Sequence, residues 1–323
     1  MTPYVDSHCH VTTSIEPKSI RLPNVPFQCC IMSNNGYDWW KLVNSPVADA
    51  NTKLGFGVHP WYSHLYYLSE DGTSPSKEAH YRSILQGPRE AELNRIILRL
   101  PEPKNLVSYI DANFSTTSCD CIGEIGLDKL FRLPENGFYQ GDDTAPLSRV
   151  KVKMDHQVKV FVQMCQLAVK HSLPVSLHCV KAPNQMFELC QTHLLPHKGI
   201  NICLHSYTGS VETLTGAWLK NFPRERLFLS ISSYVNFKNL ESASKLLQAL
   251  PLECILTETD FTWDTSSEND IQEALDFVLS RITHEHDLPS VERAKEIVYA
   301  NFRRFVEGGD VSTPASDSMY NVH

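Results

Sequence analysis

The sequence predicts an α/β fold of the TIM-barrel type, (β/α)8, in which eight parallel strands alternate with helices. Two observations support this prediction: eight short apolar runs recur along the chain, and amphipathic helical patterns follow most of them. A third observation concerns the polar residues, because a histidine or a carboxylate stands at the end of most runs. The 323 residues fit one barrel of this kind, although two ordinary domains would also fit.

Most of the eight runs are continuously apolar, as strands buried on both faces of a parallel sheet should be. The predicted strands are Pro3–His8, Phe27–Ser33, Lys53–His59, Cys121–Gly126, Val175–His178, Ile200–His205, Leu227–Ser232 and Ile255–Thr259. The clearest helical pattern between them is Asp155–His171, which carries apolar residues along one face. Further helices are predicted over Gln185–His193, Val211–Asn221, Leu240–Leu250 and Ile271–Arg281.

Two connections are longer than a barrel needs. The first contains a polar stretch, Ser69–Glu78, and a predicted helix over Pro88–Arg99. We therefore expect inserts at about 62–106 and 132–150 on the face at the carboxyl ends of the strands. Connections this long are usually lids, partner surfaces or disordered segments. A single barrel domain is expected over 1–307, and a disordered tail over 308–323, where few apolar residues occur.

Composition narrows the classes of protein that this chain can represent. No apolar run approaches the ~20 residues needed to span a membrane, and the N-terminus has no secretory signal pattern. Several of the ten cysteines lie inside apolar runs and no CxxC pair occurs, which favours free thiols in a reducing cytoplasm or nucleus. The net charge of −8 argues against broad electrostatic capture of nucleic acid, but bound cations can neutralise phosphate locally.

Polar side chains stand at or just beyond the carboxyl ends of the predicted strands, which converge on one face of a barrel. They are His10, His59, Glu124, His178, His205 and Asp260. His8 and His10 alternate along one strand, so both rings can face one ion. Taken singly, these residues could be core histidines or helix caps. Together, so many ligand types without basic partners favour a dinuclear hydrolytic site with the central carboxylate of Glu124 bridging two cations.

The chain resembles the TatD-type metal-dependent deoxyribonucleases of the amidohydrolase superfamily. The resemblance rests on seven motifs in family order: Asp6–His10 (DSHCH), Gly57–Pro60 (GVHP), Gly123–Asp128 (GEIGLD), Leu173–Cys179 (LPVSLHC), His205–Gly209 (HSYTG), Glu258–Asp260 (ETD) and Asn301–Phe305 (NFRRF). It implies a metallo-dependent hydrolase barrel, and the long inserts suggest a divergent eukaryotic, fungal branch.

The resemblance also implies a ligand set and a reaction. One metal would be bound by His8, His10, Glu124 and Asp260, and the other by Glu124, His178 and His205. A water activated by metal would attack the phosphorus of a DNA phosphodiester, with Asp260 as general base. Family members typically act on DNA ends, some in the 3′→5′ direction. Zinc suits the histidine ligands, whereas magnesium or manganese suits an oxygen-rich site, and the sequence does not choose among them.

Substrate contacts are less firmly indicated than metal ligands. The resemblance places His59 beside the substrate, and Tyr207, Thr208 and Asp128 around the pocket. Members often carry an arginine two positions after the Gly-Leu-Asp motif, but here Lys129 or Arg132 would have to serve. Where many members have Arg-Asp after the histidine at 178, this chain has Val180-Lys181. These departures concern phosphate contacts and leave the metal ligands intact.

Two other functions remain open at this point. The same barrel and metals could hydrolyse a small amide, ester or lactone, as elsewhere in the superfamily. Alternatively, the barrel could be a scaffold that binds protein partners through its inserts.

Overall fold

Eight parallel strands form the centre of the protein. The computed structural model describes residues 2–12, 27–44, 51–69, 73–138 and 145–307, so the tail predicted over 308–323 lies outside it. The barrel strands are β1 (Tyr4–Cys9), β2 (Phe27–Met32), β3 (Thr52–Gly55), β7 (Ile122–Asp128), β9 (Val175–Val180), β10 (Ile202–Leu204), β11 (Leu227–Ser232) and β12 (Ile255–Glu258). Each overlaps one of the predicted runs. Strand β3 ends at Gly55, earlier than expected, and beyond it Phe56 N–H donates to the carbonyl of Cys121.

The strands form two parallel sheets, β1–β2–β3 and β12–β11–β10–β9–β7, which meet at two seams. At one seam Gly55 pairs with Cys121 in a single parallel bridge. At the other, His10 N–H donates to the carbonyl of Phe261 (2.8 Å) and Asp260 N–H donates to that of His8 (3.0 Å). The predicted α/β barrel is therefore confirmed. Fewer backbone hydrogen bonds join the strands at the two seams than within the sheets.

Side chains reinforce the seam between β1 and β12. Ser7 Oγ donates to the carbonyl of Thr257 (2.9 Å), and Thr257 Oγ1 donates to that of Val5 (2.6 Å). The buried carboxylate of Asp6 accepts hydrogen bonds from the N–H and the hydroxyl of Thr259, at 2.9 and 2.6 Å. Burial nevertheless raises the pKa of Asp6 to about 7. Side-chain hydrogen bonds thus connect β1 to the β12 segment where few backbone hydrogen bonds do so.

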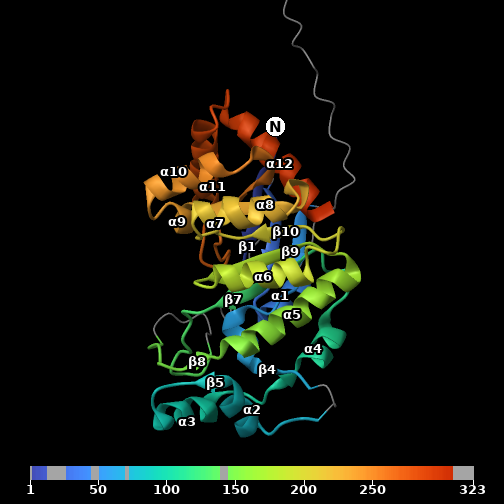
Figure 1. Ribbon diagram of the computed structural model, residues 1–323, viewed down its shortest axis with the longest axis vertical. Coiled ribbons are helices and arrows are strands. Elements are labelled where there is room, and N and C mark those ends of the chain that lie inside the picture. The colour runs from blue at the N-terminus through green and yellow to red at the C-terminus, as the bar shows by residue number, and fades with distance from the viewer. Residues whose placement is uncertain (1, 13–26, 45–50, 70–72, 139–144, 308–323) are drawn as a thin grey trace, which may run out of the picture.

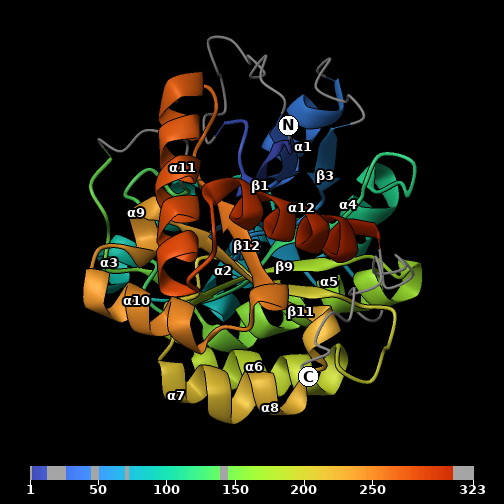
Figure 2. The ribbon, with the colours of Figure 1, turned by 90° about the horizontal axis from the view of Figure 1, so that it is seen from above.

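The outer layer consists mainly of the predicted helices. They are α5 (Met154–His171), α6 (Pro183–His193), α10 (Leu240–Ala249) and α11 (Glu268–Glu285). A helix that the sequence did not predict, α12 (Val291–Glu307), also belongs to this layer. Figure 2 shows α11 and α12 beside β1 and β12, with which both helices make contact. The segment predicted as one helix over Val211–Asn221 is divided into α7 (Val211–Thr213), a π-helical turn η2 (Leu214–Trp218) and α8 (Leu219–Asn221).

The long connection after β3 folds into its own small elements. They are η1 (Pro60–Leu65), β4 (Tyr66–Tyr67), α2 (Lys77–Ile84), β5 (Leu85–Gln86), α3 (Glu90–Arg99), β6 (Lys104–Asn105) and α4 (Leu106–Asn113). After the second long connection, β8 (Lys151–Val152) pairs antiparallel with β5. Figure 1 shows α2, α3, β5 and β8 together at the end of the molecule opposite α10–α12. The two predicted inserts therefore pack against each other.

The remaining short elements are α1 (Gly36–Asn44), η3 (Arg224–Arg226), α9 (Ser233–Asn236) and η4 (Leu252–Cys254). Among the helices of the described ranges, none has the length and apolar character needed to cross a membrane.

Candidate metal centre

Glu124, on strand β7, lies at the centre of a cluster of histidines. Its Oε2 atom lies 3.3 Å from Nε2 of His8 and 3.5 Å from Nε2 of His10. Oδ1 of Asp260 faces the same two rings, at 3.9 Å from Nε2 of His8 and 3.4 Å from Nε2 of His10. The ligand atoms of His8, His10 and Asp260 lie within 4.8 Å of one another, close enough for all three to bind one cation.

The other carboxylate oxygen of Glu124 faces three further rings. Oε1 lies 2.8 Å from Nδ1 of His178, 3.1 Å from Nε2 of His205 and 3.4 Å from Nε2 of His59. The ligand atoms of His59, Glu124 and His178 also lie within 4.8 Å of one another. The structure therefore offers His59, which we expected beside the substrate, as a further candidate ligand. The two oxygens of one carboxylate face separate groups of donors, as a bridging ligand must.

Two glycines allow the backbone around Glu124 to approach its neighbours. A Cβ atom at Gly57 would overlap backbone atoms of Glu124, and a Cβ atom at Gly126 would overlap the carbonyl of His178. The N–H of Glu124 donates to the carbonyl of Ser33 (2.9 Å). Glu124 is thus fixed by close contacts that only glycine permits at these positions.

Hydrogen bonds orient the first two histidines. His10 Nδ1 lies 3.1 Å from the carbonyl oxygen of Met32 and 3.2 Å from Nδ2 of Asn34. His8 Nδ1 lies 2.8 Å from the hydroxyl of Ser176. Both rings therefore direct Nε2 toward Glu124. Nε2 of His8 is buried and makes no hydrogen bond to any described residue. A lone pair on this nitrogen fits a bound cation.

The charges of the site are strongly coupled. Burial opposes a charge on His10, but Asp260 and Glu124 outweigh it and raise the pKa of His10 to about 9. Burial also lowers the pKa of His59, to about 4. The histidines around Glu124 hold the pKa of that carboxyl well below its usual range, although burial acts in the opposite direction. A cation that binds beside His10 must therefore compete with the proton on that ring.

Glu258 is a site residue to which sequence reasoning assigned no role. It is fully buried and accepts hydrogen bonds from the hydroxyls of Ser206 and Ser230. Its Oε1 atom also lies 3.3 Å from Nδ1 of His205. His8, His205 and Glu258 form a third group of ligand atoms within 4.8 Å of one another. The only signal in the sequence was its place in the Glu-Thr-Asp motif.

Asp128 is likewise closer to the centre than expected. Its Oδ2 atom lies 3.5 Å from Nε2 of His178 and accepts a hydrogen bond from Nε1 of Trp61 (2.8 Å). Its Oδ1 atom accepts one from the N–H of Phe131 (2.9 Å). Burial raises the pKa of Asp128, but His178 and these hydrogen bonds outweigh burial and lower it to about 2. An ionised Asp128 therefore holds both His178 and Trp61.

The other predicted substrate-binding residues do not belong to the cluster around Glu124. Lys129 and Arg132 are exposed and follow β7 at its carboxyl end, outside the histidine cluster. Tyr207 is buried, and its hydroxyl donates to the carbonyl of Ser210 (3.1 Å).

Comparison with known proteins identifies the family. Residues 5–307 match the family described as TatD related DNase. The chain belongs to this family. TatD-related enzymes are metal-dependent hydrolases of phosphodiester bonds, and the resemblance predicted from the seven motifs is thus confirmed.

Individual relatives cover most of this TatD-related chain. The Saccharomyces cerevisiae protein named uncharacterized deoxyribonuclease YMR262W is 41% identical over 325 residues, covering 95% of this chain and 100% of that protein. Cut9-interacting protein scn1 of Schizosaccharomyces pombe is 30% identical, covering 80% and 87%. The crystal structure of the TatD homologue YJJV from Escherichia coli superimposes with a TM-score of 0.57 at 15% identity, covering 95% and 98%, and shows the same fold. The two yeast relatives agree with the fungal branch predicted from the inserts.

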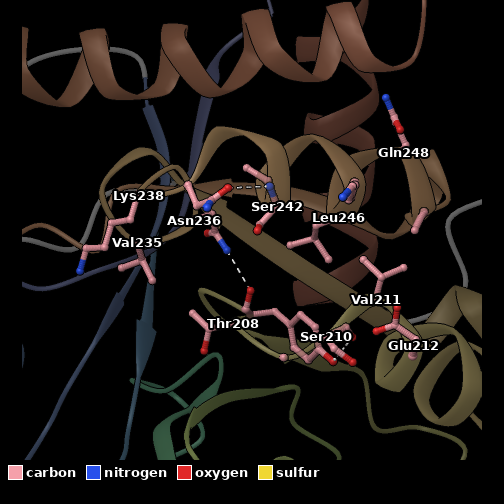
Figure 3. A pocket seen from close by; sticks show the side chains of 16 residues that line it. Thr208, Ser210, Val211, Glu212, Val235, Asn236, Lys238, Ser242, Leu246 and Gln248 are labelled. Atoms are coloured by element: carbon pink, nitrogen blue, oxygen red, sulfur yellow. Dashed lines mark hydrogen bonds between the residues drawn. The ribbon is translucent and has the colours of Figure 1, made fainter.

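Two hollows are lined by the segment from Tyr207 to Ser210, and one of them reaches the TatD-type centre. One is an open groove of about 820 Å³ between this segment, α9 and α10. Figure 3 shows Asn236 reaching across it to donate to the carbonyl of Tyr207 (2.9 Å). The other is a smaller cavity of about 300 Å³, which includes His205 in its wall. The centre therefore has room beside it for more than a phosphate group.

Proposed function

We propose that this protein is a metal-dependent deoxyribonuclease that cleaves phosphodiester bonds in single-stranded DNA or at DNA ends, as a 3′→5′ exonuclease. The observation that carries the proposal is the position of Glu124, whose two carboxylate oxygens face separate sets of histidines in a TatD-related chain. The predicted catalytic pair is Glu124, as the bridging ligand, and Asp260.

We infer two divalent ions, Zn²⁺, Mg²⁺ or Mn²⁺, per chain. His8, His10, Glu124 and Asp260 would hold one, and Glu124, His178 and His205 the other. When bound, such ions lower the pKa of a water molecule and neutralise charge on phosphoryl oxygens. The buried Nε2 of His8, which makes no hydrogen bond to any described residue and lies 3.3 Å from Oε2 of Glu124, supports this proposal, as do the groups of donors that converge within 4.8 Å.

Asp260 is our candidate for the general base. Its side chain is 29% exposed, whereas that of Glu124 is 3% exposed, so Asp260 can meet a water molecule from solvent. Burial opposes its ionisation, but His205, His10 and His8 outweigh burial and lower the pKa of Asp260. It is therefore ionised and able to accept a proton at neutral pH. Its backbone has a positive φ of 59°, which is uncommon outside glycine and recurs at functional sites.

Substrate binding is proposed for His59, Lys129, Arg132 and Tyr207. Lys129 and Arg132 supply positive charge on the loop after β7, where phosphates next to the cleaved bond would lie. Close by, the rings of Trp61 and Phe131 stack with centroids 5.0 Å apart and an interplanar angle of 12°. Aromatic surfaces of this kind bind unpaired bases. They favour a single-stranded substrate.

The test is a cleavage assay with metal-stripped protein. Mg²⁺, Mn²⁺ or Zn²⁺ is restored separately, and each form is given single-stranded DNA labelled at the 3′ or the 5′ end, matched RNA and a small carboxylic ester. Stepwise shortening from the 3′ end in a metal-dependent reaction supports the proposal. Ester hydrolysis without cleavage of either nucleic acid would move the function to a small ester, amide or lactone.

A second function, protein binding, is proposed for the inserts at about 62–106 and 132–150. Hydrogen bonds join them, such as those from Arg99 to the carbonyl of Glu135 (2.7 Å) and from the N–H of Arg149 to Glu92 (2.9 Å), and β8, directly after the second insert, pairs with β5. One relative, scn1, is named for an interaction with another protein. Exchanging exposed residues of α3, such as Leu98 (80% exposed), for lysine should weaken partner capture and leave cleavage intact. Capture unaffected by such changes would exclude α3 as the docking surface.

We further propose one barrel domain over 1–307 and a location in the cytoplasm or nucleus. All ten cysteines are free, and nine of them are buried, as expected in a reducing compartment.

A further inference from the structure

The cavity of about 300 Å³ beside His205 has an aromatic and apolar wall. It lies between the ends of β9 and β10 and the helices α6 and α7, and Tyr207, Trp218 and Met186 contribute to its lining. Lys181, which is exposed, also lines it. The volume is at the lower end of the range for small-molecule sites. The cavity can therefore hold one flat aromatic group next to the metal centre.

Trp218 supplies an unused hydrogen-bond donor in this wall. Its side chain is 1% exposed, and its Nε1–H has no hydrogen-bond partner among the described residues. A buried N–H without an acceptor destabilises the protein, so such a group in a native site calls for an explanation. An acceptor on a bound ligand would satisfy it.

The position of Trp218 is determined by an unusual backbone. It ends the π-helical turn Leu214–Trp218, and such turns are rare and occur often at functional sites. The rings of Phe187 and Phe222 hold the indole, with centroids 5.2 and 5.3 Å away. The π turn interrupts what would otherwise be a regular helix from Val211, and the indole is held in place by aromatic packing.

We propose that this cavity binds one unpaired nucleobase of the nucleotide whose phosphate lies at the metal centre. The inference rests on the proposed nuclease function, because His205 belongs both to the cavity wall and to the candidate ligand set. The base is sandwiched by aromatic and apolar groups and offers a ring nitrogen or carbonyl oxygen to Nε1–H of Trp218. Lys181, which also lines the cavity, then faces the phosphates of the DNA substrate.

The larger groove on the other side of Tyr207 does not fit this role. It is open, and its amide side chains are already engaged: Asn236 bonds to Tyr207, and Asn239 accepts a hydrogen bond from the N–H of Ser242 (Figure 3). Its lining includes none of the six candidate metal ligands. The enclosed cavity therefore selects the base, and it can do so only when that base is unpaired.

The kinetic test compares two DNA oligonucleotides that differ at one position. One has a normal base on the nucleotide to be cleaved and the other has an abasic residue there. Since stacking of one base changes affinity by roughly 5- to 150-fold, we expect kcat/KM to favour the normal substrate by about tenfold or more. Thr213→Trp, which fills the cavity, should bring this ratio close to one. Thr215→Trp, an exposed position two residues away, should keep the wild-type ratio.

A binding measurement separates this inference from the nuclease proposal. Metal-free protein is dialysed to equilibrium against thymidine 5′-monophosphate or deoxyribose 5-phosphate. We expect tighter binding of the nucleotide, weakened by Trp218→Phe, which keeps an aromatic ring but removes the N–H. Equal binding of both compounds by wild-type protein would overturn the base site, even if DNA is cleaved. Selective nucleotide binding without any DNA cleavage would retain the base site and refute the nuclease.

Discussion

The Nδ1 atom of His205 lies 3.3 Å from Oε1 of Glu258, a carboxylate that is fully buried among serine hydroxyls. The opposite ring nitrogen, Nε2, lies 3.1 Å from Glu124. A carboxylate behind a histidine fixes the orientation of the ring and makes its other nitrogen a better metal donor. We therefore expect Glu258 to support metal binding through His205.

Glu258→Gln should weaken metal binding. The amide keeps the size of the side chain but removes the negative charge behind His205, and loss of such a partner typically costs about 10- to 100-fold in metal affinity. Competition with a coloured chelator measures the change. Glu253→Gln, at an exposed glutamate nearby in the chain, is the control. An unchanged affinity in Glu258→Gln would show that Glu258 does not support the ligand.

Asp260→Asn should lower kcat by about 10²- to 10⁴-fold, because the amide cannot accept a proton from water. Asparagine tolerates the positive φ at this position, so the backbone should be preserved. Asp287→Asn is a matched control, since Asp287 is exposed and also has a positive φ, of 49°. If Asp260→Asn retains wild-type kcat in a single-turnover assay, the base is another residue.

Gly57→Ala should destabilise the protein and disturb the centre together. The new methyl group would overlap the backbone of Glu124, and overpacking of this kind typically costs about 1–3 kcal/mol. Gly216→Ala is the control, because a Cβ atom there would meet nothing within 4 Å. Urea denaturation measures both. Equal stability of the two variants would mean that the barrel can widen at Gly57 without loss.

A cluster of buried histidines away from the centre should make stability depend on pH. Burial, and then the neighbouring His156 and His80, lower the pKa of His64 to about 3, and burial lowers that of His156 to about 4. The unfolded chain binds these protons near its ordinary pKa of about 6.5. The stability that depends on keeping these two histidines neutral is therefore fully present above pH 6.5. It is lost as pH falls toward 4 and 3.

His64→Leu should reduce this loss. The free energy of unfolding, measured by urea denaturation at pH 7.5, 6.0 and 5.0, should fall less steeply in the variant than in the wild type. His197→Leu, which changes an exposed histidine, is the control. Parallel curves for His64→Leu and the wild type would assign the acid sensitivity to other groups.

The sequence allowed the barrel to be predicted because its strands are short apolar runs whose ends carry polar residues. The run before His178 and the run before His205 each correspond to a strand, β9 and β10, and the predicted convergence follows from parallel packing. Local pattern was sufficient there.

Other features depend on contacts between distant segments. Nothing near Glu258 in the sequence shows that Ser206 and Ser230 surround it, since Ser230 lies on β11 and Ser206 follows β10. The π turn ending at Trp218 lies within the regular helix predicted over Val211–Asn221. A single extra residue per turn barely changes the apolar pattern, so the sequence does not reveal it. The pairing of β5 with β8, which joins the two inserts, is equally invisible in sequence.

In the proposed function, Glu124 joins two cations into one centre on which cleavage depends. The most direct measurement is calorimetric titration of metal-stripped wild-type protein and Glu124→Ala with Mn²⁺ and Zn²⁺, with the same samples assayed on single-stranded DNA. We predict two ions per chain and metal-dependent cleavage in the wild type, and loss of both the second ion and the activity in the variant. Undiminished cleavage by Glu124→Ala would contradict the account.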